Sequence, residues 1–222
     1  MRKYLRLLCL VFIGFATNAA AKGVVINELM YHAPNELESL EYIELYNSDE
    51  VLIDLSGWAF TNGIRYTFPE GTKIEPNAYI IVCLDLEVFQ AHYGEEINAL
   101  GNFKGSLSNS GERVTLSDKR GKRIDSVKYG DRPPWPSGAD GYSSSLERIS
   151  PSVKSKASNW ASSPLPLDER RPAGTPGRQN ASYSANLPPV ISKVKFSPNT
   201  PMPNQSVTVQ AKVADKDGLD EV

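Results

Sequence analysis

Apolar and polar side chains alternate along two neighbouring stretches near the start of the chain. Ile43 and Leu45 point to one side of a strand predicted over residues 42–46, and the residues between them point to the other side. Residues 47–50 favour a turn, because Asn, Ser and Asp side chains can bond to nearby backbone groups. A second alternating run covers residues 51–56. The two runs together predict an antiparallel hairpin with one face in the core and the other face in water.

Further short runs predict the other strands of an antiparallel β-sandwich. They cover residues 23–31, 65–68, 79–84, 100–103, 113–117, 123–129 and 142–149. The run at residues 79–84 is apolar on both sides, so we expect a strand that is covered on both faces. The 16 glycines and 16 prolines of the chain provide the turns that many short strands require. The pattern therefore places the chain in the all-β class.

One short helix interrupts the strands. Asp85 is a favourable N-cap residue, and Gly94 is a favourable C-cap residue. Phe89 and Tyr93 are four positions apart, so they share one face of a helix. We expect this helix, over residues 85–93, to pack against the sandwich.

Several of these segments resemble, in the same order, the bacterial lamin tail domain. The resemblance covers about residues 23–180 and rests on an ordered series of ordinary strands and turns rather than on one specific motif. The matching segments include Val25-Ile-Asn-Glu-Leu-Met-Tyr31, Glu41-Tyr-Ile-Glu-Leu-Tyr-Asn47, Asp54-Leu-Ser-Gly-Trp58, Gly111-Glu-Arg-Val-Thr-Leu116, Ile124-Asp-Ser-Val-Lys-Tyr-Gly130 and Thr175-Pro-Gly-Arg-Gln-Asn180. The resemblance implies an immunoglobulin-like β-sandwich on a secreted or surface protein, with no catalytic residues to transfer.

The C-terminal part of the chain is divided by composition. Residues 154–180 are polar and interrupted by prolines, and we expect them to run back over the sandwich with Trp160 packed against it. Trp135, in an irregular proline-rich loop, is expected to lie across a sheet edge. Residues 181–189 read as a linker. Residues 190–222 alternate again and predict about two strands, which resemble the start of an incomplete immunoglobulin-like domain. The predicted lamin-tail-like domain is therefore residues 22–180.

The first 21 residues have the pattern of a signal peptide. Arg2, Lys3 and Arg6 precede an apolar run over residues 7–16, and small residues end the segment at Ala21. The apolar run is too short to span a bilayer, so we expect cleavage after Ala21 and no transmembrane segment afterwards. Secretion, or a surface or periplasmic location, is the resulting expectation.

Charge and cysteine content narrow the partners of the mature chain. Loss of three basic residues with the signal peptide leaves 21 basic and 26 acidic residues, a formal charge of −5. Such a chain is not built to wrap nucleic acid or an anionic membrane. Cys83 is then the single remaining cysteine, which excludes an intrachain disulfide. Its apolar neighbours predict a core side chain rather than a nucleophile.

Catalytic constellations are missing from the sequence pattern. The chain has two histidines, His32 and His92, but no Gly-x-Ser-x-Gly and no His-Glu-x-x-His motif. A catalytic base needs a nucleophile or ligand partner within hydrogen-bond reach. We therefore interpret both histidines as ordinary surface or half-buried residues, and we predict no catalytic, cofactor-binding or metal-binding residue and no cofactor.

Acidic residues near the predicted first two strands leave three interpretations open. Glu28 and Glu44 fall on strands expected to be neighbours, with Glu36, Glu38 and Glu41 in the loop between them. They could form a weak cation site of hard oxygen ligands, or an acid and base pair for glycoside cleavage. The favoured interpretation is a set of solvated charges, because no contiguous calcium loop is present. Residues 215–220 likewise predict a turn rather than a calcium loop.

Two surface features are also candidates for binding. Lys119, Arg120, Lys122 and Arg123 cluster at a predicted hairpin tip and could contact an anionic polymer, but they lack interleaved aromatic residues. A solvated turn is the favoured interpretation of this cluster. Exposed aromatic residues could line a binding face; the candidates are Tyr42, Tyr46 and Trp135.

Three functional hypotheses follow. The first is a non-catalytic interaction or spacer module of an exported bacterial protein, whose partner is a protein or an envelope polysaccharide. The second is the N-terminal accessory part of a longer exported enzyme, a hydrolase or a surface kinase-like protein, with its catalytic domain beyond Val222. The third is a weak cation- or glycan-binding module. Nucleic acid is not an expected partner of any of them.

Overall fold

The computed structural model describes residues 23–33, 38–165 and 173–215. The predicted signal peptide, Glu36 and nearly all of the turn predicted at residues 215–220 lie outside these ranges. The strands are β1 (Val24–Met30), β2 (Tyr42–Asn47), β3 (Ile53–Asp54), β4 (Ala59–Asn62), β5 (Tyr66–Thr67), β6 (Lys73–Ile74), β7 (Tyr79–Cys83), β8 (Ala99–Leu100), β9 (Arg113–Ser117), β10 (Arg123–Lys128), β11 (Leu146–Arg148), β12 (Trp160–Ser162), β13 (Val190–Ser197) and β14 (Thr208–Ala214). The helices are α1 (Leu86–Tyr93) and the short 3-10 turns η2 (Glu38–Leu40), η3 (Ser137–Ala139) and η4 (Ala157–Asn159).

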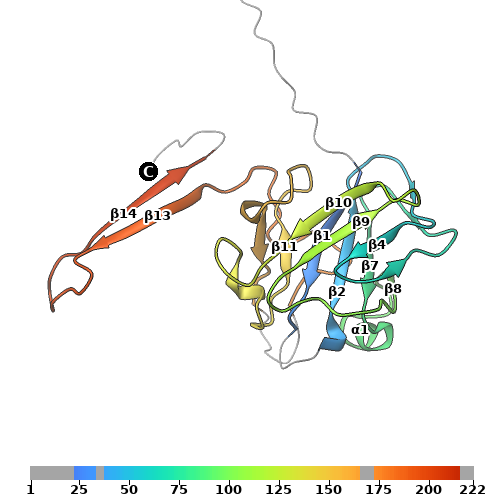
Figure 1. Cartoon of the computed structure of the whole chain (residues 1–222), viewed down its shortest axis with the longest axis horizontal. Helices are drawn as coiled ribbons and strands as arrows, with labels where there is room; N and C mark the ends of the chain where they lie inside the picture. Colours follow the sequence, from blue (N-terminus) through green and yellow to red (C-terminus); the bar gives the residue numbers. More distant parts are fainter. Residues whose placement is uncertain (1–22, 34–37, 166–172, 216–222) are drawn as a thin grey trace, which may run out of the picture.

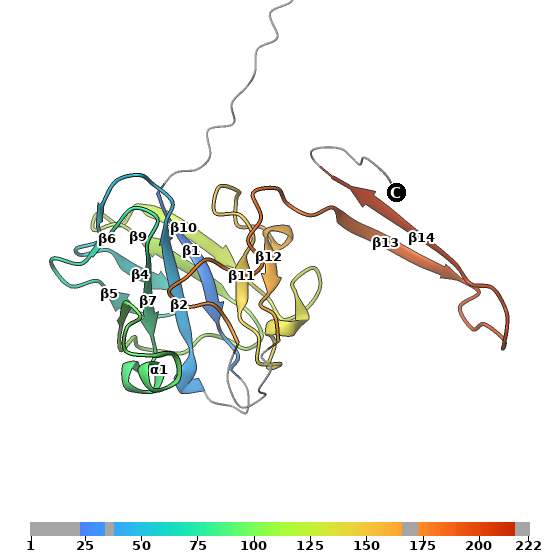
Figure 2. The same ribbon diagram turned by 180° about the vertical axis from the view of Figure 1, so that it is seen from behind.

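Two sheets form the body of the molecule. One sheet has the strand order β12-β11-β1-β2-β7-β8, and the other has the order β10-β9-β4-β5. Figure 1 shows the four-stranded sheet in front of the six-stranded sheet, and Figure 2 shows the same two layers from behind. All pairings among these strands are antiparallel except that of β7 with β8, which is parallel. The predicted all-β, immunoglobulin-like sandwich with one short helix is confirmed.

The main core lies between the two sheets. Alternate residues of β1, β2, β7 and β9 point into it, as a period of two requires. Its fully buried members include Ile26, Leu29, Ile43, Leu45, Ile80 and Val82 from the six-stranded sheet and Phe60, Val114, Leu116 and Val127 from the four-stranded sheet.

The hairpin predicted from residues 42–56 is wrong. β2 pairs with β1 and β7, whereas β3 pairs with β6. The Asn47 side chain explains part of the difference, because its Nδ2 donates to the carbonyl oxygens of Val51, Ile74 and Glu75. These bonds turn the chain away from β2 and leave Val51 exposed.

The predicted hairpin also required the second face of β2 to lie in water, but this face is buried. A smaller apolar cluster covers the outer face of the six-stranded sheet, and Figure 2 shows α1 on this side. Tyr42 is fully buried there, between the rings of Phe89 and Tyr93 at centroid distances of 5.6 and 5.7 Å. Ile81 and Cys83 of β7 belong to the same cluster, so β7 is covered on both faces as predicted.

The predicted helix is confirmed with its cap. The Asp85 side chain accepts hydrogen bonds from the backbone N–H groups of Glu87 and Val88, each at 3.1 Å. At the other end, Gly94 adopts a positive φ and its N–H donates to the carbonyl oxygen of Gln90. Within the described ranges, no helix has the length and apolar character needed to cross a membrane.

Replacing Asp85 with Ala is expected to lower the free energy of unfolding by about 1 kcal/mol, because two backbone donors of the first turn lose their acceptor. Asp85→Asn is the matched control, since its side-chain oxygen can still accept these bonds. Urea unfolding followed by circular dichroism measures both variants. Equal stability of Asp85→Ala and the parent chain would contradict a capping role.

The C-terminal half follows the predicted order with shorter strands. β9 and β10 form the expected hairpin. Only Leu146–Arg148 of the run predicted at residues 142–149 is strand, and β12 continues the sheet beyond it. Trp160 is buried, and its ring lies 6.4 Å from that of Trp135, which packs against the core.

β13 and β14 form a separate two-stranded sheet. Figures 1 and 2 both show this hairpin extending away from the sandwich. Several of its apolar side chains are exposed, namely Val190, Ile191, Val194, Phe196 and Val209, as is Val207 just before β14.

Candidate functional site

A row of three buried glutamates crosses the six-stranded sheet. Glu28 of β1 pairs in register with Glu44 of β2 on one side and with Glu147 of β11 on the other. All three have no exposed side-chain surface, and Glu41 is almost equally buried. The interpretation of Glu28 and Glu44 as solvated charges is therefore wrong.

A break in strand alternation places Glu28 on the outer face. The register between β1 and β2 shifts between Ile26 and Glu28, at Asn27. Ile26 and Leu29 consequently both point into the main core, although they are three residues apart. A bulge of this kind moves every later side chain to the opposite face. Glu28 is thereby brought into line with Glu44 and Glu147.

The glutamate row holds residues 173–184, which we call the return segment. Backbone N–H groups of this segment donate to each glutamate in turn: Thr175 to Glu28 at 2.9 Å, Gly177 to Glu44 at 2.7 Å and Ser182 to Glu147 at 2.8 Å. Figure 2 shows the segment crossing β1 and β2 on the outer side. Buried backbone donors need acceptors, and here the carboxylates supply what a neighbouring strand would supply elsewhere.

Other donors occupy the remaining oxygen positions of the row. Glu28 Oε1 also accepts from the hydroxyl groups of Tyr42 and Ser145, and Glu44 Oε1 accepts from Asn27 Nδ2. Because the carboxylates are enclosed by donors, no substrate can reach them as an acid and base pair. Among the described residues, no group of three His, Cys, Asp or Glu side chains is arranged to hold a metal ion.

The row favours a bound proton. Thr175 Oγ1 lies 3.2 Å from Glu28 Oε2 and 3.0 Å from Glu147 Oε1. A hydroxyl group has one hydrogen, so it can form a separate two-centre hydrogen bond with each carboxyl group only when one of the carboxyl groups is protonated and donates to it. Burial raises the pKa of Glu28 to about 7, and the charge of Glu147 contributes in the same direction. Burial, together with Glu28, also raises the pKa of Glu44 well above its usual value.

The two histidines and the cysteine form contacts that do not involve the glutamate row. His32 Nδ1 lies 2.8 Å from Asp140 Oδ1, and His92 Nδ1 lies 3.2 Å from the carbonyl oxygen of Val88 on its own helix. Cys83 is buried as predicted, and burial raises the pKa of its thiol to about 12. Such a thiol is a poor nucleophile at neutral pH.

The basic cluster predicted at the hairpin tip is exposed. Lys119, Arg120 and Lys122 lie in the turn between β9 and β10, and Arg123 is the first residue of β10. The turn is closed by Asp118, whose carboxylate accepts from the N–H groups of Arg120 and Lys122 at 2.9 Å. This geometry fits the solvated turn that the sequence favours.

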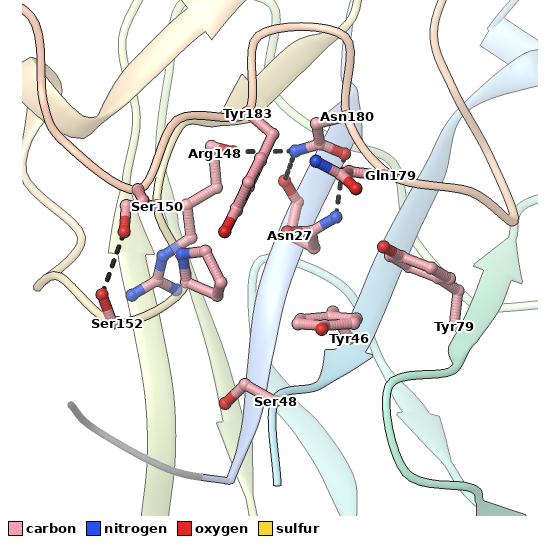
Figure 3. A pocket seen from close by; sticks show the side chains of 12 residues that line it. Asn27, Tyr46, Ser48, Tyr79, Arg148, Ser150, Ser152, Gln179, Asn180 and Tyr183 are labelled. Carbon is pink, nitrogen blue, oxygen red and sulfur yellow. Dashed lines mark hydrogen bonds between the residues drawn. The ribbon is translucent and has the colours of Figure 1, made fainter.

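An aromatic pocket lies at the end of the six-stranded sheet where β1 begins. Its volume is about 290 Å³, and its lining includes Tyr46, Tyr79, Tyr183, Arg148 and Gln179 (Figure 3). The Tyr46 and Tyr79 rings stack with their centroids 4.8 Å apart. Of the three aromatic residues proposed from the sequence, only Tyr46 lines this pocket, because Tyr42 is buried under α1 and Trp135 packs beside Trp160.

Sequence reasoning missed most of the pocket because distant segments build it. Asn180 of the return segment joins them: its Nδ2 donates to the carbonyl oxygens of Asn27 and Arg148, at 3.0 and 2.9 Å (Figure 3). Gln179 and Tyr183 flank Asn180 and so reach the pocket. The sequence signal available was the expectation that residues 154–180 run back over the sandwich.

Comparison with known protein families places the sandwich in a family. The family model described as Lamin Tail Domain matches residues 17–131, just over half of the chain. No curated protein matches. The matched range contains strands β1 to β10, with Glu28 and Glu44. Strands β11 and β12, Glu147 and the return segment follow it. On the evidence of this match and of the sandwich that carries it, the chain belongs to the Lamin Tail Domain family.

Proposed function

We propose that this protein is a non-catalytic interaction and spacer module of an exported bacterial protein, acting in the cell envelope or outside the cell. Its partner is a protein or an envelope polysaccharide. Membership of the Lamin Tail Domain family, which is an immunoglobulin-like fold, supports an interaction role. Fold alone does not determine function, so the argument also needs the side chains.

The state of the glutamate row is the observation that carries the proposal. The groups best suited to acid–base chemistry by their raised pKa values, Glu28 and Glu44, are enclosed and bonded to the return segment. Perturbed carboxyl groups often mark active sites, but structural networks perturb them as well. Here the carboxyl groups stabilise the module, which leaves its surface as the part that can act.

Export is tested by expressing the full chain in a bacterium and determining the N-terminal residue of the product. We expect a mature protein that begins at Lys22, recovered from the periplasm or the medium, because residues 1–21 have a basic start, an apolar run and small residues before the cut. Ala21→Arg, which replaces a small residue at the cleavage site, should block processing. An uncleaved protein in the cytoplasm would overturn the export part of the proposal.

The β13–β14 hairpin favours a second candidate, an accessory region of a longer exported enzyme. A two-stranded sheet is marginally stable alone, and this one exposes apolar residues such as Ile191, Phe196 and Val209. If residues 190–222 are the first part of an immunoglobulin-like domain, further strands after Val222 would cover these apolar residues. The reading frame beyond Val222 tests this: a hydrolase or kinase-like domain would support the candidate, and a stop codon directly after Val222 would contradict it.

A further inference from the structure

We propose that the aromatic pocket at the end of the six-stranded sheet binds a short segment of a neutral oligosaccharide. This inference rests on the proposed interaction function and names the chemical class of the ligand. The proposal follows from the shape of the pocket, its aromatic surface, its charge and its free hydrogen-bonding groups.

The pocket has the construction of a binding site rather than of a surface groove. Its wall is assembled from β1, β2, β7, the loop after β11 and the return segment. Strand pairing and side-chain hydrogen bonds hold most of these segments in place. In the loop after β11, for example, the hydroxyl groups of Ser150 and Ser152 lie 3.0 Å apart and bond to each other. A volume of about 290 Å³ is at the small end of ligand pockets, which suits a few sugar rings rather than a large cofactor.

Three tyrosines supply an apolar surface with polar tips. Tyr46 and Tyr79 form the stacked pair, and Tyr183 lies across the pocket from them in Figure 3. Among the described residues, the hydroxyl groups of Tyr79 and Tyr183 have no hydrogen-bond partner, whereas that of Tyr46 donates to Asn77 at 3.2 Å. A tyrosine ring can cover the C–H face of a sugar while its hydroxyl bonds to the sugar's rim.

The charge of the pocket favours a neutral ligand. Among the residues that the structure describes, Arg148 is the only charged side chain in the lining, and it is 3 % exposed. Its Nη1 forms a 2.7 Å ion pair with Asp125, so its charge is already compensated. Its Nε is buried without a hydrogen-bond partner. An unsatisfied buried donor costs free energy, so this Nε reduces the net gain from burying the arginine and offers no charge to an acidic ligand.

The remaining polar groups can both donate and accept. Gln179 is exposed at the rim. The Ser48 hydroxyl donates to the Gly23 carbonyl oxygen at 2.8 Å and Ser152 bonds to Ser150, so these hydroxyl oxygens can accept a further hydrogen bond from a ligand. Amides and hydroxyls match sugar hydroxyls, which also donate and accept. A peptide fits less well, because β1 and β2 are paired on both sides and present no free strand edge for it.

The test is titration of the ¹⁵N-labelled full chain, followed by NMR, with cellohexaose, chitohexaose, mannohexaose, an acidic galacturonan oligosaccharide and a proline-rich peptide. We expect saturable shifts with at least one neutral oligosaccharide, located at the pocket. Tyr183→Ala and Gln179→Ala should each weaken binding about tenfold, since they remove a stacking surface and a rim hydrogen bond. Tyr142→Ala is the matched control, because Tyr142 is 68 % exposed and lies outside the pocket.

Tyr183 is 45 % exposed, so its replacement is not expected to disturb folding; for the wild-type chain, the location of the shifts decides the question in any case. No saturable binding of a neutral sugar, binding of only the acidic sugar or the peptide, or shifts away from the pocket would each overturn the inference. If Tyr183→Ala and Gln179→Ala both bound the sugar with the affinity of the parent chain, the inference would be overturned as well. Flat titrations of a correctly exported and processed chain would leave the proposed interaction function standing without its saccharide ligand.

Discussion

A chain that ends after Ser163 is expected to lose cooperative folding, whereas a chain that ends after Ala185 is expected to unfold like the parent protein. The shorter chain lacks the return segment, so Glu28, Glu44 and Glu147 lose the backbone donors that Thr175, Gly177 and Ser182 provide. Three adjacent carboxyl groups would then lie opposite one another on a partly uncovered sheet. Like charges directly opposite on neighbouring strands are destabilising, and buried polar groups without partners cost about 1–3 kcal/mol each.

The longer chain is the matched control for truncation itself. It keeps the bond from the Ser184 N–H to the Ile149 carbonyl oxygen and removes residues 186–222, which include the hairpin that extends from the sandwich. Thermal unfolding followed by near-ultraviolet circular dichroism distinguishes the two chains. A cooperative transition of normal midpoint in the chain that ends after Ser163 would show that the return segment is dispensable.

Between pH 5 and pH 8, the free energy of unfolding is expected to fall by about 2–3 kcal/mol through Glu28 alone. The pKa of Glu28 is about 7 in the folded chain, compared with an ordinary value of 4.5. The folded state therefore binds more protons than the unfolded state in this window, and stability decreases as the pH rises. The contribution is fully present below pH 4.5 and is lost through pH 7, at about 1.4 kcal/mol per unit of pKa difference. The raised pKa of Glu44 acts in the same direction.

Two replacements of Glu28 separate the proton from the hydrogen bonds. Glu28→Gln keeps an acceptor for Thr175 N–H, Tyr42 and Ser145, and its amide can donate to Thr175 Oγ1 as a protonated carboxyl group would. We expect it to retain most of the stability at pH 5 and to flatten the pH dependence. Glu28→Leu removes every acceptor and should cost about 3–5 kcal/mol at pH 5. Urea unfolding at pH 5, 6.5 and 8 measures all three chains. If Glu28→Gln kept the full pH dependence, Glu28 would not be the group that titrates.

Local rules predicted the elements that depend on neighbouring residues. The cap at Asp85, the β9–β10 hairpin and the double-sided burial of β7 follow from residue types within a few positions, and all are confirmed. The partner of β2 could not be derived in this way. The stretch that begins at Val51 follows β2 closely in sequence, but strand pairing depends on packing against distant segments, and β2 pairs with β1 and β7 instead.

The glutamate row shows the same limit at the candidate site. Alternation correctly placed Glu44 on the face of β2 that is opposite to the face of Ile43 and Leu45. Whether the Glu44 face is exposed to water depends on α1 and the return segment. The bulge at Asn27, which brings Glu28 to the same face, has no signal in a single sequence. The aromatic pocket is a third case, since Gln179 and Tyr183 line it together with Tyr46 where the return segment, through Asn180, is bonded to β1 and β11.

The sequence by itself determined the all-β class, the short capped helix and the inward faces of the main strands, because each depends on periodicity and on residues close in the chain. Only the tertiary structure decided which strands pair, which of the outward faces are covered, and that three glutamates become buried and share donors from residues 173–184. The physical reason is that burial and pKa are properties of surroundings, and two of the groups that bond to Glu28, Ser145 and Thr175, lie more than a hundred residues away.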